Sequence, residues 1–385
     1  MMIGWLLAGF LILSMIFNTA CGTEDEPVVE EKPNEVVVEG THIIWDSSSL
    51  RKITDGNYAR IRELDNQQLI AVYSRSNHIY IKYSDDQGST WENEQLLAEG
   101  DANYIMTNAE AIQLANKSIV VGLNRRVKDE RWGSDYTYGI MIVSSDDYGQ
   151  TWSEPQLIYN AGNSGDIGCW EPAFLQLPDG ELQCYFANEY PYPNTNEQEI
   201  SLLRSFDNGE SWTAEIETAT FAQGARDGMP VPILDGDNIL LAIEDNSNNH
   251  VLQPTIIKEP VSSNWKNGLV GSNDSRRFHA VPDFSRTRYA GAPYLAKLNS
   301  GELILSFQDR NEREKNFETM KVLVGESVIE PFDHESEPFA ISKSNSAKWN
   351  SLCVLSSGEV IAVTSTNAYG KGIYMVIGEV VNNSK

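Results

Sequence analysis

Two glutamates carry the clearest chemical signal in this sequence. Glu171 lies in the Trp-Glu-Pro segment at 170–172, and Glu244 directly follows the apolar run Ile239–Ile243. A carboxylate at the end of such a run is partly desolvated, so one of the two is expected to have a raised pKa. Paired carboxylates cleave glycosidic bonds by acid/base and nucleophilic catalysis. The simpler alternative is that Glu244 forms a structural ion pair with Arg226.

Other polar and aromatic side chains stand where apolar runs begin or end. Arginine and amide groups can hold sugar hydroxyls, and aromatic rings can form the walls of a sugar site. The candidate substrate-binding residues are Tyr58, Arg60, Arg226, Asp227, Tyr289 and Trp349. Further residues at equivalent positions are Arg75, Asn108, Glu110, Arg125, Arg126, Trp170, Glu189, Asp245, Arg288, Asp309, Arg310, Lys348, Thr366 and Asn367. For any one of them, a solvated loop residue is the alternative interpretation.

The elements that must position these side chains repeat along the chain. Three segments share the form S-x-D-x-G-x-[ST]-W, and they begin at Ser84, Ser145 and Ser205, about 60 residues apart. Each follows a strand-like run. Ser and Asp side chains can bond the amides of a turn, Gly supplies positive φ, and Trp packs beneath the turn. We therefore expect these aspartates to brace hairpin turns and not to catalyse.

A second pattern, in which a polar turn joins two apolar strands, recurs six times. Its copies are Ala59–Ser74, Ala111–Leu123, Pro172–Ala187, Val231–Ile243, Pro293–Phe307 and Leu352–Val363. A period of about 58 residues suffices for the four strands of a propeller blade. The sequence thus predicts an all-β, six-bladed β-propeller over residues 42–385, with His42–Trp45 completing the last blade beside Tyr374–Val381. Residues before each first strand and after each second strand would then converge at the mouth of the central funnel.

The N-terminal segment has a different character. Residues 1–17 are nearly all apolar and are followed by a small residue and Cys21. This pattern predicts a lipoprotein signal peptide over residues 1–20, with Cys21 as the lipidated N-terminus. An uncleaved signal anchor is disfavoured because the run is shorter than the ~20 residues that a spanning helix needs. Residues 21–41 are acidic and predict a disordered tether. We expect the protein to be lipid-anchored to a bacterial cell envelope.

Charge and cysteine usage narrow the functional classes. The chain has 29 Lys plus Arg against 55 Asp plus Glu, a net charge of −26. This balance argues against nucleic acid as a partner and against electrostatic docking on anionic lipid.

A Cys169–Cys184 disulfide would be possible, but buried free thiols are favoured. The five histidines and the cysteines lack metal-ligand spacing, so no metal or cofactor is expected.

The Asp-box repeats, the six blades and the Trp170-Glu171-Pro172 and Ile243-Glu244-Asp245 segments together resemble glycoside hydrolase family 93. Members of that family are exo-α-L-arabinanases that release arabinobiose from arabinan by a retaining mechanism. The resemblance implies that Glu171 and Glu244 are the catalytic pair, one the acid/base and the other the nucleophile. We assign the acid/base to Glu171 and the nucleophile to Glu244, an order that the sequence alone does not fix. A retaining mechanism requires the two carboxyl groups to lie about 5–5.5 Å apart. The resemblance also implies an oligo- or polysaccharide substrate.

A second resemblance, to the sialidases, provides the main alternative. The segment Tyr58-Ala59-Arg60-Ile61-Arg62 resembles the sialidase Phe-Arg-Ile-Pro motif, although Arg62 replaces its proline. Arg226 and Arg288 would complete an arginine triad for a sialic acid carboxylate. However, the expected aspartate is missing from segment 75–78. A non-catalytic glycan-binding propeller ranks third.

Overall fold

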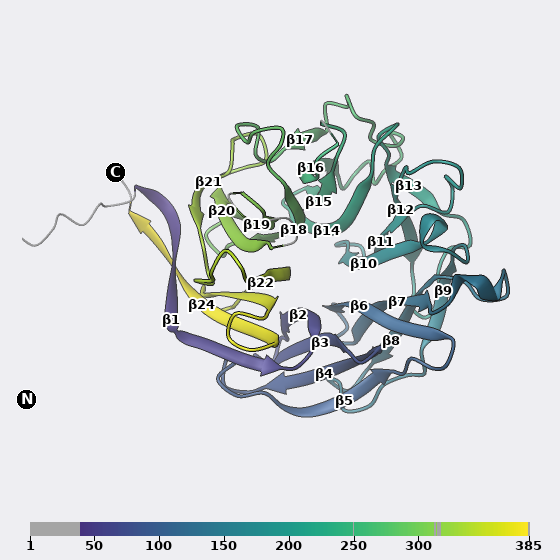
Figure 1. Ribbon diagram of the computed structural model, residues 1–385, viewed down its shortest axis with the longest axis horizontal. Helices are drawn as coiled ribbons and strands as arrows, with labels where there is room; N and C mark the ends of the chain where they lie inside the picture. Colours follow the sequence, from purple (N-terminus) through teal and green to yellow (C-terminus); the bar gives the residue numbers. More distant parts are fainter. Residues whose placement is uncertain (1–38, 249, 312, 314–316, 384–385) are drawn as a thin grey trace, which may run out of the picture. The chain divides into compact units, whose positions relative to one another are not determined.

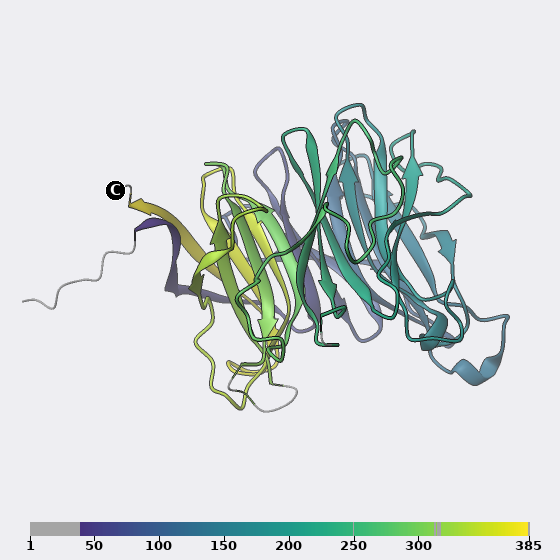
Figure 2. The same ribbon diagram turned by 90° about the horizontal axis from the view of Figure 1, so that it is seen from above.

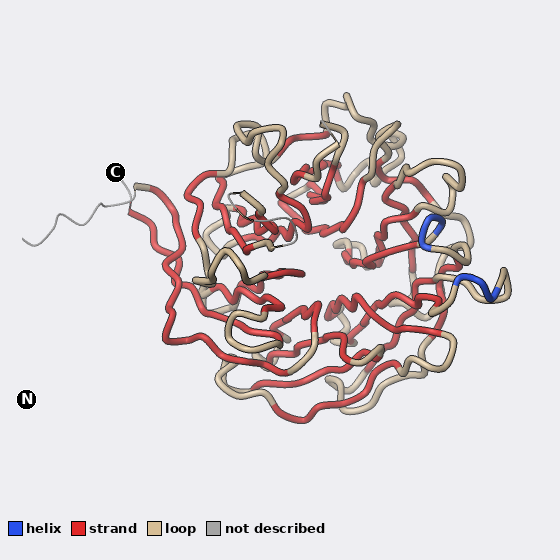
Figure 3. The backbone as a smooth tube through the Cα atoms, viewed as in Figure 1, coloured by secondary structure: helices blue, strands red, loops and turns tan. Residues whose placement is uncertain are grey.

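A computed structural model describes residues 39–248, 250–311, 313 and 317–383. The predictions for residues 1–20 and for most of 21–41, including the lipidation of Cys21, lie outside the described residues. Within the described residues almost all regular structure is β-strand, with two short 3₁₀ helices, η1 (Glu130–Trp132) and η2 (Gly165–Ile167) (Figure 3). No helix in this part of the chain has the length and apolar character needed to cross a bilayer.

The described residues form six four-stranded antiparallel sheets, here called blades 1–6, that follow one another around a ring (Figure 1). Blade 1 contains β2 (Asn57–Glu63), β3 (Leu69–Arg75), β4 (His78–Ser84) and β5 (Glu92–Ala98). Blade 2 contains β6 (Tyr104–Gln113), β7 (Ile119–Val127), β8 (Gly139–Ser145) and β9 (Gln156–Asn160). Blade 3 contains β10 (Cys169–Gln176), β11 (Leu182–Asn188), β12 (Glu199–Ser205) and β13 (Glu217–Thr220).

The second half of the ring has the same organisation. Blade 4 contains β14 (Asp227–Asp235), β15 (Asn238–Asp245), β16 (Gln253–Pro260) and β17 (Arg277–His279). Blade 5 contains β18 (Ala290–Lys297), β19 (Leu303–Asp309), β20 (Thr319–Gly325) and β21 (Asp333–Ser336). Blade 6 contains β22 (Ala347–Val354), β23 (Val360–Thr366), β24 (Gly372–Asn383) and β1 (Gly40–Thr54). The predicted six-bladed propeller is confirmed.

The ring closes because β1, from the N-terminal side of the fold, is the outer strand of the last blade. It pairs antiparallel with β24, with His42 opposite Val381 and Trp45 opposite Gly378. The prediction that His42–Trp45 completes blade 6 is therefore confirmed. Closure of this kind ties the two ends of the propeller together through main-chain hydrogen bonds and removes an open gap between blades 1 and 6.

Apolar side chains fill the spaces between neighbouring blades. Ile70 and Val72 of β3 pack in one buried cluster with Val121 and Leu123 of β7, and comparable clusters join the other blades. These β-branched and apolar runs are buried on both faces because each blade is covered by its neighbours. Figure 2 shows the blades edge-on, stacked side by side with loops at both ends of the strands. Cys169 and Cys184 lie in this core as free buried thiols, as favoured above.

The Asp-box turns follow the third strands of blades 1–3. In the second copy, Asp147 accepts hydrogen bonds from the amide of Thr151 (2.8 Å) and from its hydroxyl (2.6 Å), while Ser145 Oγ accepts from Gly149 N (2.8 Å). Gly149 has φ 81°, and a Cβ there would lie 2.5 Å from the Tyr83 hydroxyl. These aspartates brace turns, as predicted.

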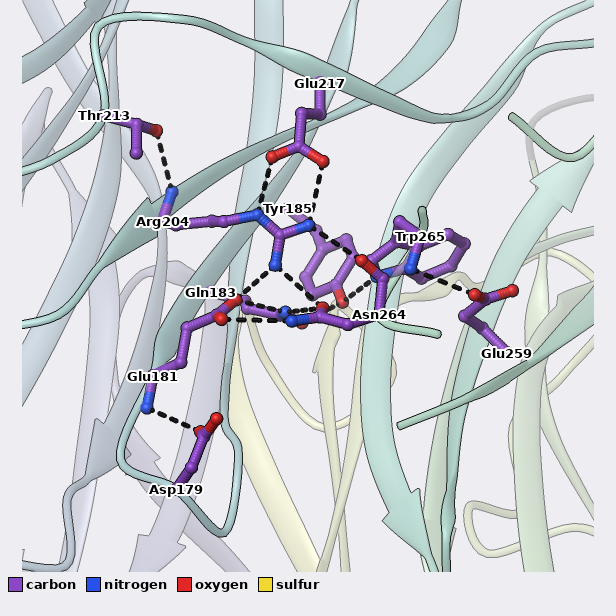
Figure 4. A network of polar contacts seen from close by, with 10 residues as sticks. All are labelled: Asp179, Glu181, Gln183, Tyr185, Arg204, Thr213, Glu217, Glu259, Asn264 and Trp265. Atoms are coloured by element: carbon purple, nitrogen blue, oxygen red, sulfur yellow. Dashed lines mark hydrogen bonds and ion pairs between the residues drawn. The ribbon is translucent and has the colours of Figure 1, made fainter. Parts of the chain in front are cut away.

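A buried polar network joins blades 3 and 4 on their outer side (Figure 4). Arg204 of β12 bonds Glu217 of β13 through Nε (2.6 Å) and Nη2 (2.9 Å), and it also forms an ion pair with Glu181. Its Nη1 donates to Asn264, which follows β16 (2.7 Å), and the neighbouring Trp265 indole donates to Tyr185 (2.9 Å). The network occupies the turn region after the third strand of blade 4, in which the sequence has no Asp box.

Candidate active site

The innermost strand of every blade contains a β-bulge at the same register position. One residue in each bulge has a positive φ: Tyr58 (53°), Asn108 (53°), Glu171 (45°), Met229 (48°), Ala292 (49°) and Trp349 (58°). A left-handed backbone is unfavourable for residues other than glycine, and such strain is tolerated where the surrounding structure enforces it. Bulges also redirect side chains beside functional sites. Glu171 is therefore one of six equivalent residues at the central axis.

Side chains from the second strand of the preceding blade hold these bulges in place. The bulge amides donate as follows: Tyr58 N to Ser365 Oγ (3.0 Å), Asn108 N to Ser74 Oγ (3.2 Å), Glu171 N to Asn124 Oδ1 (2.8 Å), Ala292 N to Glu244 Oε2 (2.8 Å) and Trp349 N to Gln308 Oε1 (2.7 Å). The remaining equivalent position is occupied by Ala187, which has no side-chain acceptor. Glu244 thus has a structural role in addition to any chemical one.

A cavity of about 610 Å³ lies over this ring of bulges. Both predicted catalytic residues, Glu171 and Glu244, line it. Its other lining residues are Asn57, Tyr58, Thr107, Asn108, Arg126, Gly165, Asp166, Trp170, Glu189, Gln198, Arg226, Met229, Leu252, Tyr289, Gln308 and Trp349. Two carboxylates from blades 3 and 4, separated by more than seventy residues in sequence, therefore share one site with aromatic rings and hydrogen-bonding groups.

One oxygen of Glu171 is already occupied by hydrogen-bond donors. Asn108 Nδ2 donates to Oε1 at 2.8 Å, and Arg126 Nη2 lies 3.7 Å from the same oxygen. The Thr107 hydroxyl donates to Asn108 Oδ1 (2.8 Å), which directs the amide NH₂ toward Glu171. Burial raises the pKa of Glu171 to about 7, the charges of Glu244 and Glu189 act in the same direction, and Arg126 opposes them. At neutral pH this carboxyl group is close to half protonated.

The Glu244 carboxylate is held between two glycines. A Cβ at Gly228 would lie 3.1 Å from Oε1, and one at Gly291 would lie 3.0 Å from Oε2. Burial raises the pKa of Glu244, while the Ala292 N–H and the positive charge of Arg226 oppose this and favour the carboxylate. With Oε2 bonded to the backbone, Oε1 is the oxygen left for chemistry in the cavity.

The predicted binding residues divide into two groups. Tyr58, Arg226, Tyr289 and Trp349 line the cavity. The alternative in which Glu244 is ion-paired with Arg226 is wrong, because the Arg226 guanidinium bonds Glu189 instead. Glu189, Asn108 and Arg126 stood among the strand-end polar residues in the sequence. Gln198, just before β12, and Thr107, in β6 beside the bulge residue Asn108, also line the cavity, and neither had a distinguishing signal in the sequence.

Arg60 and Asp227 do not line this cavity, contrary to their proposed role in substrate binding. Arg60 is 2% exposed, and its guanidinium lies 4.0 Å from the centre of the Tyr58 ring and 3.4 Å from Glu110. Arg60 comes after the bulge of β2 in the chain, so its side chain lies deeper along the central axis than Tyr58, which lines the cavity. Asp227 is fully buried, and its Oδ1 is 2.6 Å from Arg277 Nη2 of β17, within its own blade.

The arginines named for a sialidase triad do not meet in one cavity. Arg226 lines the central cavity, Arg60 is buried behind Tyr58, and Arg288 bonds Asp309 and Glu335 (both 2.9 Å). Within the described ranges, no group of three or more His, Cys, Asp or Glu residues is placed to hold a metal ion.

Comparisons with known proteins agree with this fold. Residues 65–220 match the model of the BNR repeat-like domain, and no curated protein matches the chain. An α-L-arabinofuranosidase of Fusarium graminearum, solved with an iminosugar inhibitor, has a TM-score of 0.67 and 16% identity, with 87% of this chain and 97% of that chain covered. An α-L-arabinanase of Penicillium chrysogenum, solved with arabinobiose, has a TM-score of 0.64 and 16% identity, with coverages of 86% and 97%.

The Trypanosoma rangeli sialidase is a more distant neighbour. It has a TM-score of 0.55 and 12% identity, and the match covers 88% of this chain but 57% of the sialidase. At these identities the similarities establish the fold alone. Residues 65–220 thus match a BNR repeat-like domain, and the described residues fold as a six-bladed β-propeller similar to those of an α-L-arabinanase, a glycoside hydrolase family 93 α-L-arabinofuranosidase and, more distantly, a sialidase.

Proposed function

We propose that the protein is an exo-acting, retaining glycoside hydrolase that acts on α-L-arabinofuranosyl chains such as arabinan. The observation that carries this proposal is that Glu171 and Glu244 line one cavity and that the pKa of Glu171 is raised to about 7. A general acid needs a pKa near the working pH, and a nucleophile must be ionised. The raised pKa of Glu171 suits the acid. At Glu244 the Ala292 N–H and Arg226 favour the ionised form that a nucleophile needs, and they oppose burial, which raises the pKa of this group.

In the first step, Glu171 gives its proton to the glycosidic oxygen while Glu244 Oε1 attacks the anomeric carbon. The bond between that carbon and the leaving oxygen breaks, and a covalent glycosyl-enzyme forms. Because Asn108 donates to Glu171 Oε1 at 2.8 Å, we assign the transferable proton to Oε2. In the second step, the deprotonated Glu171 takes a proton from water, which attacks the same carbon and releases Glu244.

The exo mode of action is supported by the closed floor of the cavity. Tyr58, Met229 and Ala292 pack together as a buried apolar cluster, and they come from blades 1, 4 and 5. Residues from opposite blades can touch only at the axis, so this cluster closes the funnel. Arg62 of β2 bonds the Tyr294 hydroxyl of β18 (2.6 Å) further along the axis. A sugar chain therefore enters from the mouth by one end.

The choice of substrate draws on the arabinanase and arabinofuranosidase neighbours, both of which were solved with bound arabinobiose. An exo-sialidase remains the second candidate, on the basis of the sialidase neighbours. It is less favoured because Arg60, Arg226 and Arg288 do not converge on one cavity. A non-catalytic glycan-binding propeller is the third candidate.

Substrate choice and catalysis can be tested together. Purified protein is offered linear arabinan and an aryl sialoside, and the released sugars are identified. Arabinobiose supports the proposal, free sialic acid supports the second candidate, and no product supports a binding module or a different glycosidase. Glu171→Gln and Glu244→Gln should each abolish turnover, whereas Glu210→Gln, an exposed residue of the third Asp box, should not. Full activity in either cavity variant would remove that glutamate from the mechanism.

We also propose that Cys21 carries a lipid that anchors the protein to the bacterial cell envelope, facing the periplasm or the cell surface. The apolar segment before Cys21 supports this proposal. Cys21→Ala should move the protein from the membrane fraction to the soluble fraction. Retention of the variant in the membrane fraction would contradict lipid anchoring at this residue.

A further inference from the structure

A second cavity, of about 880 Å³, adjoins the central one between blades 6 and 1. The two cavities share three lining residues, Asn57, Thr107 and Trp349. We call the second one the side pocket. Its remaining lining residues are Asp55, Gly56, Ser74, Arg75, Ser76, Asn77, Ile105, Ser346, Lys348, Ser365, Thr366, Asn367, Lys371 and Gly372. A molecule bound beside Glu171 and Glu244 can therefore extend past Trp349 into this pocket.

Nine of the seventeen residues that line the side pocket are serine, threonine or asparagine, and apolar atoms make up the larger part of its lining surface. The hydroxyl and amide groups of these nine side chains can both donate and accept hydrogen bonds. Three of its four charged side chains have partners of opposite sign. Arg75 pairs with Glu94 (2.5 Å), Lys348 with Glu318 (2.7 Å) and Asp55 with Lys52 (2.7 Å). Such a surface matches the many hydroxyl groups of a neutral sugar better than a compact anion.

Trp349 lies at the boundary between the two cavities. Its side chain is 37% exposed, and its ring centroid lies 6.0 Å from that of Tyr58. Its backbone, with φ 58°, is held by Gln308, which accepts the amide hydrogen bond (2.7 Å), and by Arg60, which donates to its carbonyl (3.1 Å). The partly exposed indole offers an apolar face against which a sugar ring can pack.

From this geometry we infer that the side pocket is an accessory subsite, which binds a neutral sugar unit of the same chain whose scissile bond lies between Glu171 and Glu244. The inference rests on the proposed function and deepens it, because it makes the substrate an oligosaccharide longer than the unit held in the central cavity. The reaction itself is unchanged, and the side pocket contributes binding free energy only.

The test compares chain lengths in the full-length protein. We expect kcat/KM for linear arabino-oligosaccharides to rise with each added unit until the side pocket is filled. Lys371→Trp places a bulky ring in the side pocket, away from the central cavity. It should lower the ratio of kcat/KM for a long oligosaccharide to that for an aryl arabinoside about tenfold, which corresponds to ~1.4 kcal/mol of lost binding. Lys266→Trp, on the exposed turn after β16, is the matched control and should leave the ratio unchanged.

Two results would overturn the subsite. One is a wild-type kcat/KM that does not depend on chain length, and the other is an equal loss of kcat/KM on both substrates in Lys371→Trp.

Binding of the same oligosaccharides to Glu244→Gln, measured by calorimetry, separates this inference from the proposed reaction. Affinity that rises with chain length and falls in Glu244→Gln/Lys371→Trp supports the subsite even if the wild type cleaves no arabinoside. If the affinity of Glu244→Gln for these oligosaccharides does not depend on their chain length, the subsite is refuted even if the wild type is active.

Discussion

The side-chain amide of Asn108 donates a 2.8 Å hydrogen bond to Oε1 of Glu171, and the two residues occupy equivalent left-handed bulge positions in adjacent blades. The bulge of blade 2 therefore orients the carboxyl group presented by the bulge of blade 3. Because a donor on one oxygen favours the ionised form and leaves the other oxygen to carry the proton, we expect Asn108 to lower the pKa of the proposed acid as well as to orient it.

Removing the Asn108 amide should change the pH dependence of catalysis. Asn108→Gly keeps the left-handed backbone accessible but eliminates the donor, so the pKa of Glu171 should rise and the alkaline limb of kcat/KM should move to higher pH. We also expect kcat/KM to fall about tenfold, equivalent to ~1.4 kcal/mol of transition-state stabilisation, because the carboxyl group is less well oriented. Asn116→Gly, in a turn of blade 2, is the control. An unchanged pH profile would exclude this positioning role.

The proposed glycosidase activity of the wild-type protein should fall as the pH rises through about 7, the raised pKa of Glu171, because the proposed acid must be protonated. On the acidic side, activity should fall at a higher pH than an ordinary glutamate would give. The reason is that burial raises the pKa of Glu244, which must be ionised to act as a nucleophile. The pH profile of kcat/KM on an aryl arabinoside measures both limbs. An alkaline limb that persists in Glu171→Gln would show that another group is titrating.

Glu244 is expected to tolerate glutamine structurally but not alanine. Gln308 already accepts the equivalent bulge amide of Trp349 at 2.7 Å, so Glu244→Gln should keep the Ala292 N–H bonded and preserve the melting temperature. Glu244→Ala leaves that buried amide without its acceptor and should lower the free energy of unfolding by about 1–3 kcal/mol. Both variants should lose at least about a thousandfold in kcat. Equal stability of the two variants in chemical denaturation would contradict the bracing role.

Catalytic activity should be sensitive to a single methyl group added at Gly291, which lies against Glu244. In Gly291→Ala the added Cβ would lie 2.6 Å from the Tyr289 hydroxyl and 3.0 Å from Glu244 Oε2. Both side chains must then shift, and a displacement of this kind costs on the order of a hundredfold in kcat. Gly271→Ala is the matched control, because a Cβ there meets no atom within 4 Å. Full activity of Gly291→Ala would show that the Glu244 position is not critical.

The network between blades 3 and 4 should contribute strongly to stability without affecting catalysis. Arg204 is 6% exposed and pairs with Glu181, which is 7% exposed, so Arg204→Ala leaves a buried carboxylate unpaired. We expect the free energy of unfolding to fall by about 3–5 kcal/mol. Arg131→Ala removes the exposed ion pair with Asp129 and should leave stability unchanged. Denaturant titration of both variants, with activity measured in native buffer, tests this expectation.

Local patterns in the sequence were sufficient to predict the architecture. The Asp boxes at Ser84, Ser145 and Ser205 and the six strand-turn-strand units depend on turn chemistry and strand alternation, which act over a few residues. The same reasoning located Glu171 and Glu244 at strand ends that face a common mouth. It also anticipated that His42–Trp45 completes blade 6, because an unpaired apolar segment remained at the start of the fold.

Tertiary structure alone decided which side chains meet. None of the six left-handed bulge residues is a glycine, and in five of the six a side chain of the preceding blade bonds the bulge amide and supports a backbone conformation that local preference disfavours. The pairing of Arg226 with Glu189, the burial of Asp227 against Arg277 and the position of Arg60 behind Tyr58 all follow from which atoms lie within reach once the ring has closed. Distances of this kind depend on the arrangement of six blades together, and no local stretch of the chain specifies them.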